Sequence, residues 1–144
     1  MTYCALVIGC AGQDGSYLTK SLLKKGYRVV GTSRNIDSEK NNHKKLKIHN
    51  EFEIVQCSID STSNFKRLIN RYFPDEIYYL SAQSSVGLSF KKPLATFESI
   101  VSTSSIILES CRELDFKGRI FFAGSSEIFG ETEKGATIYT PANP

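Results

Sequence analysis

The sequence VIGCAGQDGSYL, at residues 7–18, decides the fold because an apolar run meets three glycines and then an amphipathic run. Gly9, Gly12 and Gly15 stand three residues apart. In such a turn the first glycine permits a sharp bend, the second lets a ligand approach the backbone, and the third lets a helix pack on a strand. The N-terminus of that helix would face the phosphates of a nucleotide. A tight turn without a ligand is the alternative interpretation.

Strands and helices are expected to alternate along the 144 residues. Apolar runs predict strands at residues 3–8, 27–33, 52–59, 76–82 and 118–124. Amphipathic runs predict helices over residues 13–25, around 65–73 with Pro74 closing the helix, and over about 94–114. This order is typical of βαβ units, so we expect one α/β domain over residues 1–144 with an open, doubly wound parallel sheet. Ligands of such sheets bind beyond the carboxyl ends of the strands.

Two features of the pattern predict what is buried. The strand sequences YCALVI, EIYYL and RIFFA are almost continuously apolar, which indicates strands covered on both faces by helices. In the last predicted helix a single stripe is expected to face the core: Leu94, Phe97, Val101, Ser104, Ile107, Leu108 and Cys111. The polar residues 34–50 are expected to form a loop with at most one helical turn.

Composition excludes several classes of protein. The net charge is only +3 and the basic residues are scattered, which argues against a nucleic-acid partner. Four cysteines without paired spacing indicate buried thiols in a reducing compartment, with neither a metal site nor a disulfide framework. No apolar run is long enough to span a membrane, and no signal peptide is expected. We therefore expect a cytoplasmic protein.

The end of the second predicted strand indicates which dinucleotide is bound. A carboxylate at this position favours NAD through the ribose 2′-hydroxyl, whereas a cation favours the 2′-phosphate of NADP. The sequence here is GTSRN, with Ser33 and Arg34 and no acidic residue. Arginine suits bidentate phosphate binding, so the sequence predicts NADP. An exposed loop arginine without a ligand is the alternative.

Further cofactor contacts are expected at the other strand ends. Small and polar residues there can lie against the adenine, the ribose and the phosphates. Together with the three glycines and Arg34, the predicted cofactor-binding residues are Gln13, Asp14, Ser58, Ile59, Leu80, Ala82, Gln83 and Ser84. The contact at Ser58–Ile59 is less defined, because the acidic residue that would meet adenine comes later, at Asp60.

Several segments together resemble a known family. The spacing G-x-x-G-x-x-G is similar to that of the extended short-chain dehydrogenases/reductases, which have the Rossmann fold. The segments GQDGSYL (12–18), TSN (62–64), PDEIY (74–78) and L-x-A-Q-S-x-V-x-x-S-F (80–90) resemble the GDP-mannose 4,6-dehydratase family. That resemblance implies a lyase of deoxysugar biosynthesis with NADP, a GDP-sugar substrate, and a homo-oligomer, either dimer or tetramer.

The segment AGSSEIFG, residues 123–130, carries the residues for the reaction that the resemblance implies. Ser125 matches the serine or threonine that hydrogen-bonds the substrate hydroxyl to be oxidised, and Glu127 completes the S/T-x-E pattern of sugar-nucleotide dehydratases. Oxidation at C4 makes the C5 proton acidic, so one carboxylate can take that proton and then assist departure of the C6 hydroxyl. A solvated glutamate at a strand end is the alternative.

The family also uses a Tyr-x-x-x-Lys pair, which does not occur after Ser125. We therefore expect this chain to be the N-terminal part of a longer enzyme and to be inactive alone. Ser85 and Ala95 stand where relatives often have His and Tyr, which suggests a diverged member. A related GDP-sugar reductase or epimerase and a non-catalytic NADP-binding module remain alternative functions.

Overall fold

The computed structural model describes residues 2–35, 42–133 and 135–144. Its five strands form one parallel sheet in the order β3-β2-β1-β4-β5. The strands are β1 (Cys4–Ile8), β2 (Arg28–Ser33), β3 (Glu53–Gln56), β4 (Glu76–Tyr79) and β5 (Arg119–Phe122). All four pairings are parallel, so the predicted open, doubly wound sheet is confirmed.

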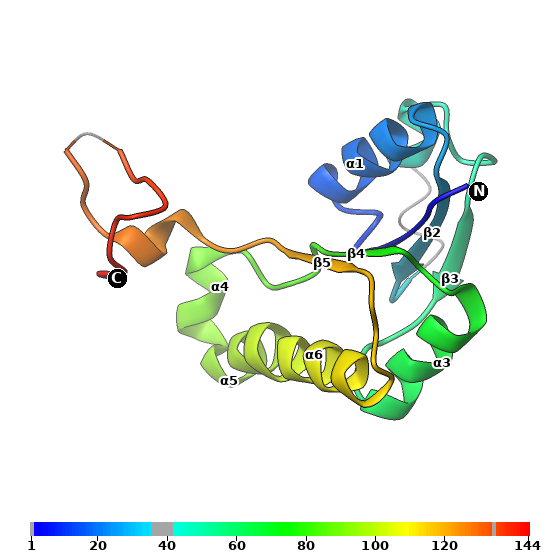
Figure 1. The fold of residues 1–144 in the computed structure, drawn as a ribbon. Helices are drawn as coiled ribbons and strands as arrows, with labels where there is room; N and C mark the ends of the chain where they lie inside the picture. The colour runs from blue at the N-terminus through cyan, green and yellow to red at the C-terminus, as the bar shows by residue number, and fades with distance from the viewer. Residues whose placement is uncertain (1, 36–41, 134) are drawn as a thin grey trace.

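Helices cover both faces of the sheet (Figure 1). They are α1 (Gln13–Lys24), α3 (Thr62–Tyr72), α4 (Val86–Lys91), α5 (Pro93–Phe97), a π-helix (Glu98–Ser102), α6 (Thr103–Glu113) and a 3₁₀ turn (Ser126–Phe129). Helix α1 lies on one face, whereas α3 and α6 pack side by side on the other. Because alternate residues of a strand point to opposite faces, β1 serves both layers.

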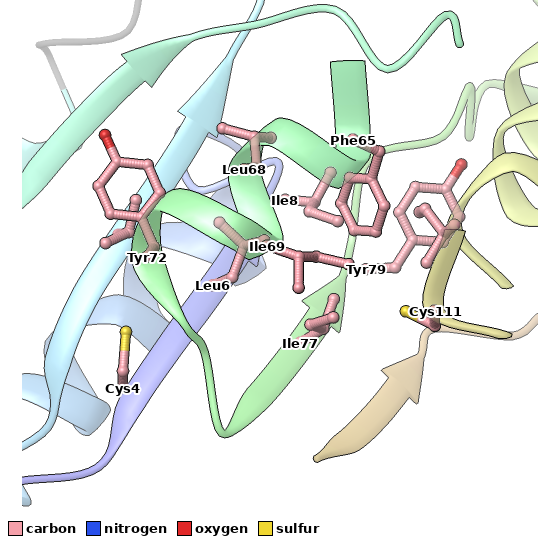
Figure 2. Packing of buried hydrophobic residues seen from close by; sticks show 12 residues of the cluster. Cys4, Leu6, Ile8, Phe65, Leu68, Ile69, Tyr72, Ile77, Tyr79 and Cys111 are labelled. Atoms are coloured by element: carbon pink, nitrogen blue, oxygen red, sulfur yellow. The ribbon is translucent and has the colours of Figure 1, made fainter. Parts of the chain in front are cut away.

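The buried core therefore has two parts that share β1. Ala5 and Val7 pack with Leu22 of α1 on one face. On the other face the side chains of β1, α3, β4 and α6 meet: Cys4, Leu6, Ile8, Phe65, Leu68, Ile69, Tyr72, Ile77, Tyr79, Ile107 and Cys111 (Figure 2). Every residue of β1 is buried, as its almost continuous apolar sequence predicts.

Helix α3 begins three residues earlier than predicted and ends before Pro74 as its sequence predicts. The Ser61 hydroxyl accepts a hydrogen bond from the Asn64 N–H and so caps the first turn. Phe73 adopts a left-handed conformation with φ of 47°, and Pro74 follows it. A proline cannot continue a helix, so the chain turns here toward β4.

The predicted helix over residues 94–114 is wrong in detail. Its middle turn is a π-helix, which inserts an extra residue and shifts the phase of the side chains that follow. Ile107 and Cys111 are buried as expected, but Leu94, Phe97, Val101 and Leu108 are exposed. In addition, residues 86–91 form α4, with Ser85 as its cap, although no helix was expected there.

The expectation that β5 is covered on both faces is also wrong. All four of its residues are exposed, including Phe121 and Phe122. In this chain β5 lies at the edge of the sheet and pairs only with β4. The apolar sequence of β5 predicts a strand, but it does not predict whether the side chains of that strand are buried.

The predictions for residues 34–50 and for the cysteines are confirmed only in part. Of residues 34–50, positions 36–41 lie outside the described residues, and residues 42–45 form the one expected helical turn. Three cysteines are buried, as expected, but Cys57 is half-buried. Burial raises the pKa of the Cys111 thiol to about 11. No helix built from the described residues is both long and apolar enough to cross a membrane.

Candidate functional site

The candidate site lies at the carboxyl end of the sheet, where the order of strands reverses. Strand β1 has β2 on one side and β4 on the other, which defines the switch point at which such sheets bind ligands. The start of α1, helix α4 and the segment after β5 all lie at this end (Figure 1). Gly9 turns the chain there with φ of +86°. A Cβ added to Gly9 would come within 2.8 Å of the Ser81 Cβ, so the ends of β1 and β4 meet closely.

The structure explains the glycine at each of the three positions of the first turn differently. A Cβ at Gly15 would lie 2.1 Å from the Gly9 carbonyl oxygen, so helix α1 packs directly on the turn. Gly12, in contrast, has φ −63° and ψ 171°, a conformation open to any residue. A Cβ at Gly12 would make only an ordinary contact of 3.5 Å. The fold itself does not require glycine at position 12, which fits a surface that a ligand approaches closely.

Helix α1 opens onto this surface. The Gly12 N–H donates to the Gly9 carbonyl at 3.1 Å, and the Ser16 N–H donates to the Gly12 carbonyl at 3.0 Å. Gly12 is the N-cap and has no side chain to occupy the first N–H groups of the helix. Gln13 and Asp14 follow it and are exposed. A helix N-terminus with accessible N–H groups fits the phosphates of a dinucleotide.

Arg34 follows β2 in a tight, hydrogen-bonded turn. The buried Ser33 hydroxyl accepts from the Asn35 N–H at 3.1 Å and lies at the same distance from the Asn35 carbonyl, to which it donates. The Gln56 amide donates to the Arg34 carbonyl at 3.2 Å. The Arg34 side chain is exposed, and its guanidinium forms no ion pair with the part of the chain that is described. This geometry fits the expected contact with an anionic group.

The predicted residues after β3 differ from one another. Ser58 is exposed, whereas Ile59 packs against the core cluster. Asp60 accepts a hydrogen bond of 2.6 Å from the Asn64 amide and so belongs to the start of α3. The Ser58 hydroxyl is therefore accessible after the end of β3, whereas the Ile59 side chain packs into the core.

After β4, the predicted residues form an ordered loop. The Leu80 N–H donates to the Ile8 carbonyl at 2.9 Å, which continues the pairing of β4 with β1. The Gln83 amide donates at 3.0 Å both to the Ser85 carbonyl and to the Thr96 hydroxyl, and its oxygen accepts from the Ser85 N–H. Gln83 therefore fixes the loop between β4 and α4. Ala82 and Ser84 are exposed at its surface, and contacts of these residues with a cofactor stay predictions.

Ser125 and Glu127 lie together directly after β5. The Ser125 hydroxyl accepts from the Glu127 N–H at 3.2 Å and caps the 3₁₀ turn. Both residues are exposed, so the hydroxyl hydrogen and the carboxylate face solvent. Since β4 alone separates β1 from β5, their ends lie roughly 10 Å apart at the usual strand spacing. The glycine-rich turn and Ser125 therefore follow strands that end at the same end of the sheet.

Two cavities lie outside this surface. One of 460 Å³ lies between β3 and α3 and reaches Ser58 at its rim. The other, of 400 Å³, lies near Pro74 and Gly118 at the opposite end of the sheet. Neither includes the glycine-rich turn, Ser125 or Glu127. Within the described residues, no group of three His, Cys, Asp or Glu side chains is placed to hold a metal ion.

The sequence did not reveal one pair of residues that touches the site. Asn42 and His43, in the segment taken as a loop, hydrogen-bond the carbonyls of Ala11 and Cys10 in the glycine-rich turn. No periodicity or motif marks these two residues, because the contact joins positions more than thirty residues apart.

A doubly wound parallel sheet whose first strand ends in a glycine-rich turn at the switch point defines a Rossmann fold. Solved structures share the fold. The UDP-glucose 4-epimerase of Thermus thermophilus, crystallised with NAD, superposes with a TM-score of 0.83 at 24% identity, over 98% of this chain and 44% of the epimerase. The enzyme of Stenotrophomonas maltophila gives 0.85 at 24% identity, over 99% of this chain and 43% of that chain.

The family is more specific than the fold. The family model described as GDP-mannose 4,6 dehydratase matches residues 6–144, and the chain belongs to that family. GDP-mannose 4,6 dehydratase 1 of Arabidopsis thaliana is 36% identical over 97% of this chain and 42% of its own length. GDP-mannose 4,6-dehydratase of Vibrio cholerae serotype O1 is 34% identical over 97% of this chain and 41% of its own length. The predicted resemblance is confirmed, and the chain spans about two fifths of these relatives.

Proposed function

We propose that the complete protein is a nucleotide-sugar 4,6-dehydratase that converts GDP-mannose into GDP-4-keto-6-deoxymannose with NADP as its bound cofactor. The observation that carries this proposal is the Ser125-x-Glu127 pair directly after β5, at the same end of the sheet as the glycine-rich turn. Relatives named as GDP-mannose 4,6-dehydratases match 97% of the chain, which supports the substrate class.

The fit of a dinucleotide rests on this chain's own residues. Gly12 has no internal reason to be glycine, and the start of α1 presents accessible N–H groups beside it. Arg34 then favours the 2′-phosphate of NADP over the free ribose of NAD, because a guanidinium forms charge-assisted, bidentate bonds with phosphate. When bound, the cofactor would accept a hydride from the sugar C4 and return it later to C6.

Ser125 and Glu127 have separate tasks in this proposal. The Ser125 hydroxyl already accepts from the Glu127 N–H, so its own hydrogen can be donated to the oxygen on the sugar C4. Once C4 is a ketone, the neighbouring C5 proton is acidic and the Glu127 carboxylate takes it. The protonated Glu127 then gives this proton to the C6 hydroxyl, which leaves as water. One carboxylate thus acts first as base and then as acid.

A base for the C4 hydroxyl must come from another part of the complete protein. A Tyr-x-x-x-Lys pattern is absent from the 144 residues. The proposal therefore concerns the complete enzyme, and this chain supplies the cofactor surface and the Ser125–Glu127 pair.

The test is to incubate the full-length protein with GDP-mannose and catalytic NADP and to identify the product by mass spectrometry and NMR. We expect a 4-keto-6-deoxy sugar with no net change in NADPH absorbance. Glu127→Gln should lower kcat at least about a hundredfold, within the usual effect of losing a general acid–base group. The matched control is Glu131→Gln, an exposed glutamate four residues further on, which should leave the rate unchanged.

Each alternative function gives a distinct result in this assay. Net consumption of NADPH on a keto-sugar would indicate a reductase, and an epimerised sugar would indicate an epimerase. Binding of NADP without turnover of any nucleotide sugar would indicate a non-catalytic module. Full dehydration by Glu127→Gln would remove Glu127 from its proposed role.

The choice of cofactor has its own test. Arg34→Ala should raise the Kd for NADP about ten- to a hundredfold, because hydrogen bonds to a charged group are worth about 1.5–3 kcal/mol. The Kd for NAD should change little. Arg119→Ala is the control, since Arg119 is equally exposed but lies at the beginning of β5, at the other end of the sheet. Equal losses for both dinucleotides would overturn the proposed contact with the 2′-phosphate.

A further inference from the structure

Two side chains from outside the glycine-rich turn hold its carbonyl groups. The Asn42 amide donates to the Ala11 carbonyl at 3.0 Å, and His43 Nε2 lies 2.9 Å from the Cys10 carbonyl. A carbonyl oxygen only accepts hydrogen bonds, so His43 Nε2 must carry the proton of this bond. We call Asn42 and His43 the carbonyl clasp.

The clasp is a rigid part of the fold. His43 is completely buried. Its ring packs edge-on against the ring of Phe52, with the two ring centroids 4.9 Å apart. The buried Ile48 donates its N–H to the His43 carbonyl at 2.9 Å, which closes the turn that carries the clasp. Phe52 in turn packs on the core cluster that contains Cys10. The clasp is thus anchored to the same core layer as the turn that it holds.

Packing alone does not explain a histidine at this position. Its Nδ1 atom is buried and has no hydrogen-bond partner among the described residues. An apolar side chain of similar size would fill the space without leaving a polar atom unpaired. The bond from Nε2 to the Cys10 carbonyl is therefore the feature that distinguishes histidine from an apolar residue here.

The clasp decides which way two peptide groups of the turn point. In a trans peptide the carbonyl and the N–H point in opposite directions, and the described chain has no cis peptide. Because the Cys10 and Ala11 carbonyls point toward the clasp, the N–H groups of Ala11 and Gly12 point away from it. The Gly12 N–H closes the turn onto Gly9, while no described residue accepts from the Ala11 N–H. A reversed peptide would place a carbonyl oxygen where that N–H now lies.

We infer that Asn42 and His43 are positioning residues for the dinucleotide, which keep the Cys10 and Ala11 carbonyl oxygens away from the diphosphate and leave the Ala11 N–H facing it. This inference rests on the proposed function, because it takes an anionic dinucleotide as the ligand of the turn. It adds that affinity for the diphosphate, common to NAD and NADP, depends on side chains that do not touch the ligand.

The test measures the Kd of NADP and of NAD by calorimetry on the full-length protein and its variants. Asn42→Ala and His43→Leu should each raise both Kd values about tenfold and to the same extent. His43→Gln should recover much of the loss, because its side-chain amide can also donate to the Cys10 carbonyl. Arg34→Ala, which acts on the 2′-phosphate, should affect NADP alone.

Two controls separate positioning from general destabilisation. Phe65→Leu weakens the core on the other face of the sheet without touching the turn, so it should lower the melting temperature but leave both Kd values unchanged. Hydrogen exchange without any nucleotide should be faster at the Gly12 amide in Asn42→Ala than in the wild type. Asn70→Ala, an exposed asparagine of α3, should leave that exchange as it is.

The outcomes distinguish this inference from the proposed function. Unchanged Kd values in both Asn42→Ala and His43→Leu, with wild-type protein that binds NADP, would overturn the inference alone. A loss of affinity in Phe65→Leu as large as in His43→Leu, with both variants equally destabilised, would also overturn it. If the wild type binds neither dinucleotide, the proposed function fails, and the role of the clasp toward a cofactor fails with it.

Discussion

Strands β1 and β5 have similar apolar sequences and opposite surroundings. Every residue of β1 is buried, whereas every residue of β5 is exposed. Strand β1 has a neighbour on each side and a helix layer on each face, while β5 pairs only with β4. The comparison shows that apolar composition specifies a strand, but that the neighbours available to it decide whether it is buried.

The two parts of the candidate site differ in the same way, because one follows the buried strand β1 and the other follows the exposed strand β5. The glycine-rich turn leaves the fully packed β1 and is held by α1, the end of β4 and the carbonyl clasp. Ser125 and Glu127 leave the exposed β5 and are supported by their own short turn and by the tail, where the Asn143 N–H donates to the Ile128 carbonyl. In this chain the proposed cofactor surface is therefore built onto the core, and the proposed reacting pair follows the edge strand.

The largest difference is expected from matched truncations in the two strands. Leu6→Ala in β1 should lower the free energy of unfolding by about 2–5 kcal/mol, because a buried leucine leaves a cavity. Ile120→Ala in β5 should cost less than about 1 kcal/mol, since Ile120 is already 38% exposed. Urea denaturation of this chain followed by circular dichroism measures both values. Equal losses would show that β5 is covered in solution.

The second comparison replaces two glycines by alanine, one at the packed start of α1 and one in the exposed helix α4. Gly15→Ala should destabilise the chain by about 1–3 kcal/mol, because its Cβ would lie 2.1 Å from the Gly9 carbonyl oxygen. Gly87→Ala in α4 should stabilise it by about 0.5–1 kcal/mol, as nothing lies near that Cβ and alanine favours a helix. Thermal unfolding of the two variants would show shifts of opposite sign. A shift of the same sign would mean that the turn can relax around Gly15.

The smallest effect is expected at Tyr78, whose ring lies 6.0 Å from that of Phe121 in β5. Burial and the hydrogen bond from its hydroxyl to Glu76 raise the pKa of Tyr78 to about 12. A raised pKa means that the folded chain favours the protonated form. That contribution is present below pH 10, where an unfolded tyrosine titrates, and is lost between about pH 10 and 12.

Tyr78→Phe should therefore reduce the loss of stability between pH 9 and pH 11.5. The measurement is the urea midpoint at each pH for the variant and the wild type. Tyr139→Phe provides the control, because Tyr139 is exposed and lies in the tail. An unchanged pH dependence in Tyr78→Phe would show that other groups cause the alkaline loss.

The sequence predicted those features that depend on neighbours in the chain. The turn at Gly9 and the end of α3 before Pro74 both follow from local conformational preferences. The parallel sheet follows from the alternation of strands and helices, whereas the order of its strands was not predicted. Ser125 and Glu127 were assigned from the resemblance of residues 123–130 to a known family, and their roles stay predictions.

The remaining features depend on contacts between distant residues. Phe97 and Leu108 were predicted to face the core but are exposed, and the π-helix at Glu98–Ser102 that interrupts the predicted helix has no simple sequence signal. The hydrogen bonds from the Gln83 amide to Ser85 and Thr96 are not indicated by local sequence, and its contact with a cofactor stays a prediction. The carbonyl clasp joins the helical turn at residues 42–45 to the first turn of the chain, and only the folded structure brings them together.

The strand order also determines how long β1 waits during translation for its second neighbour in the sheet. Strand β1 is made first, yet its second neighbour in the sheet, β4, ends at Tyr79. At the usual rate of translation, roughly 4–14 s pass between these two points. During that interval an apolar strand that will become the centre of the sheet has an unpaired edge. A nascent chain of this protein should therefore need chaperone protection most before residue 80 leaves the ribosome, and much less afterwards.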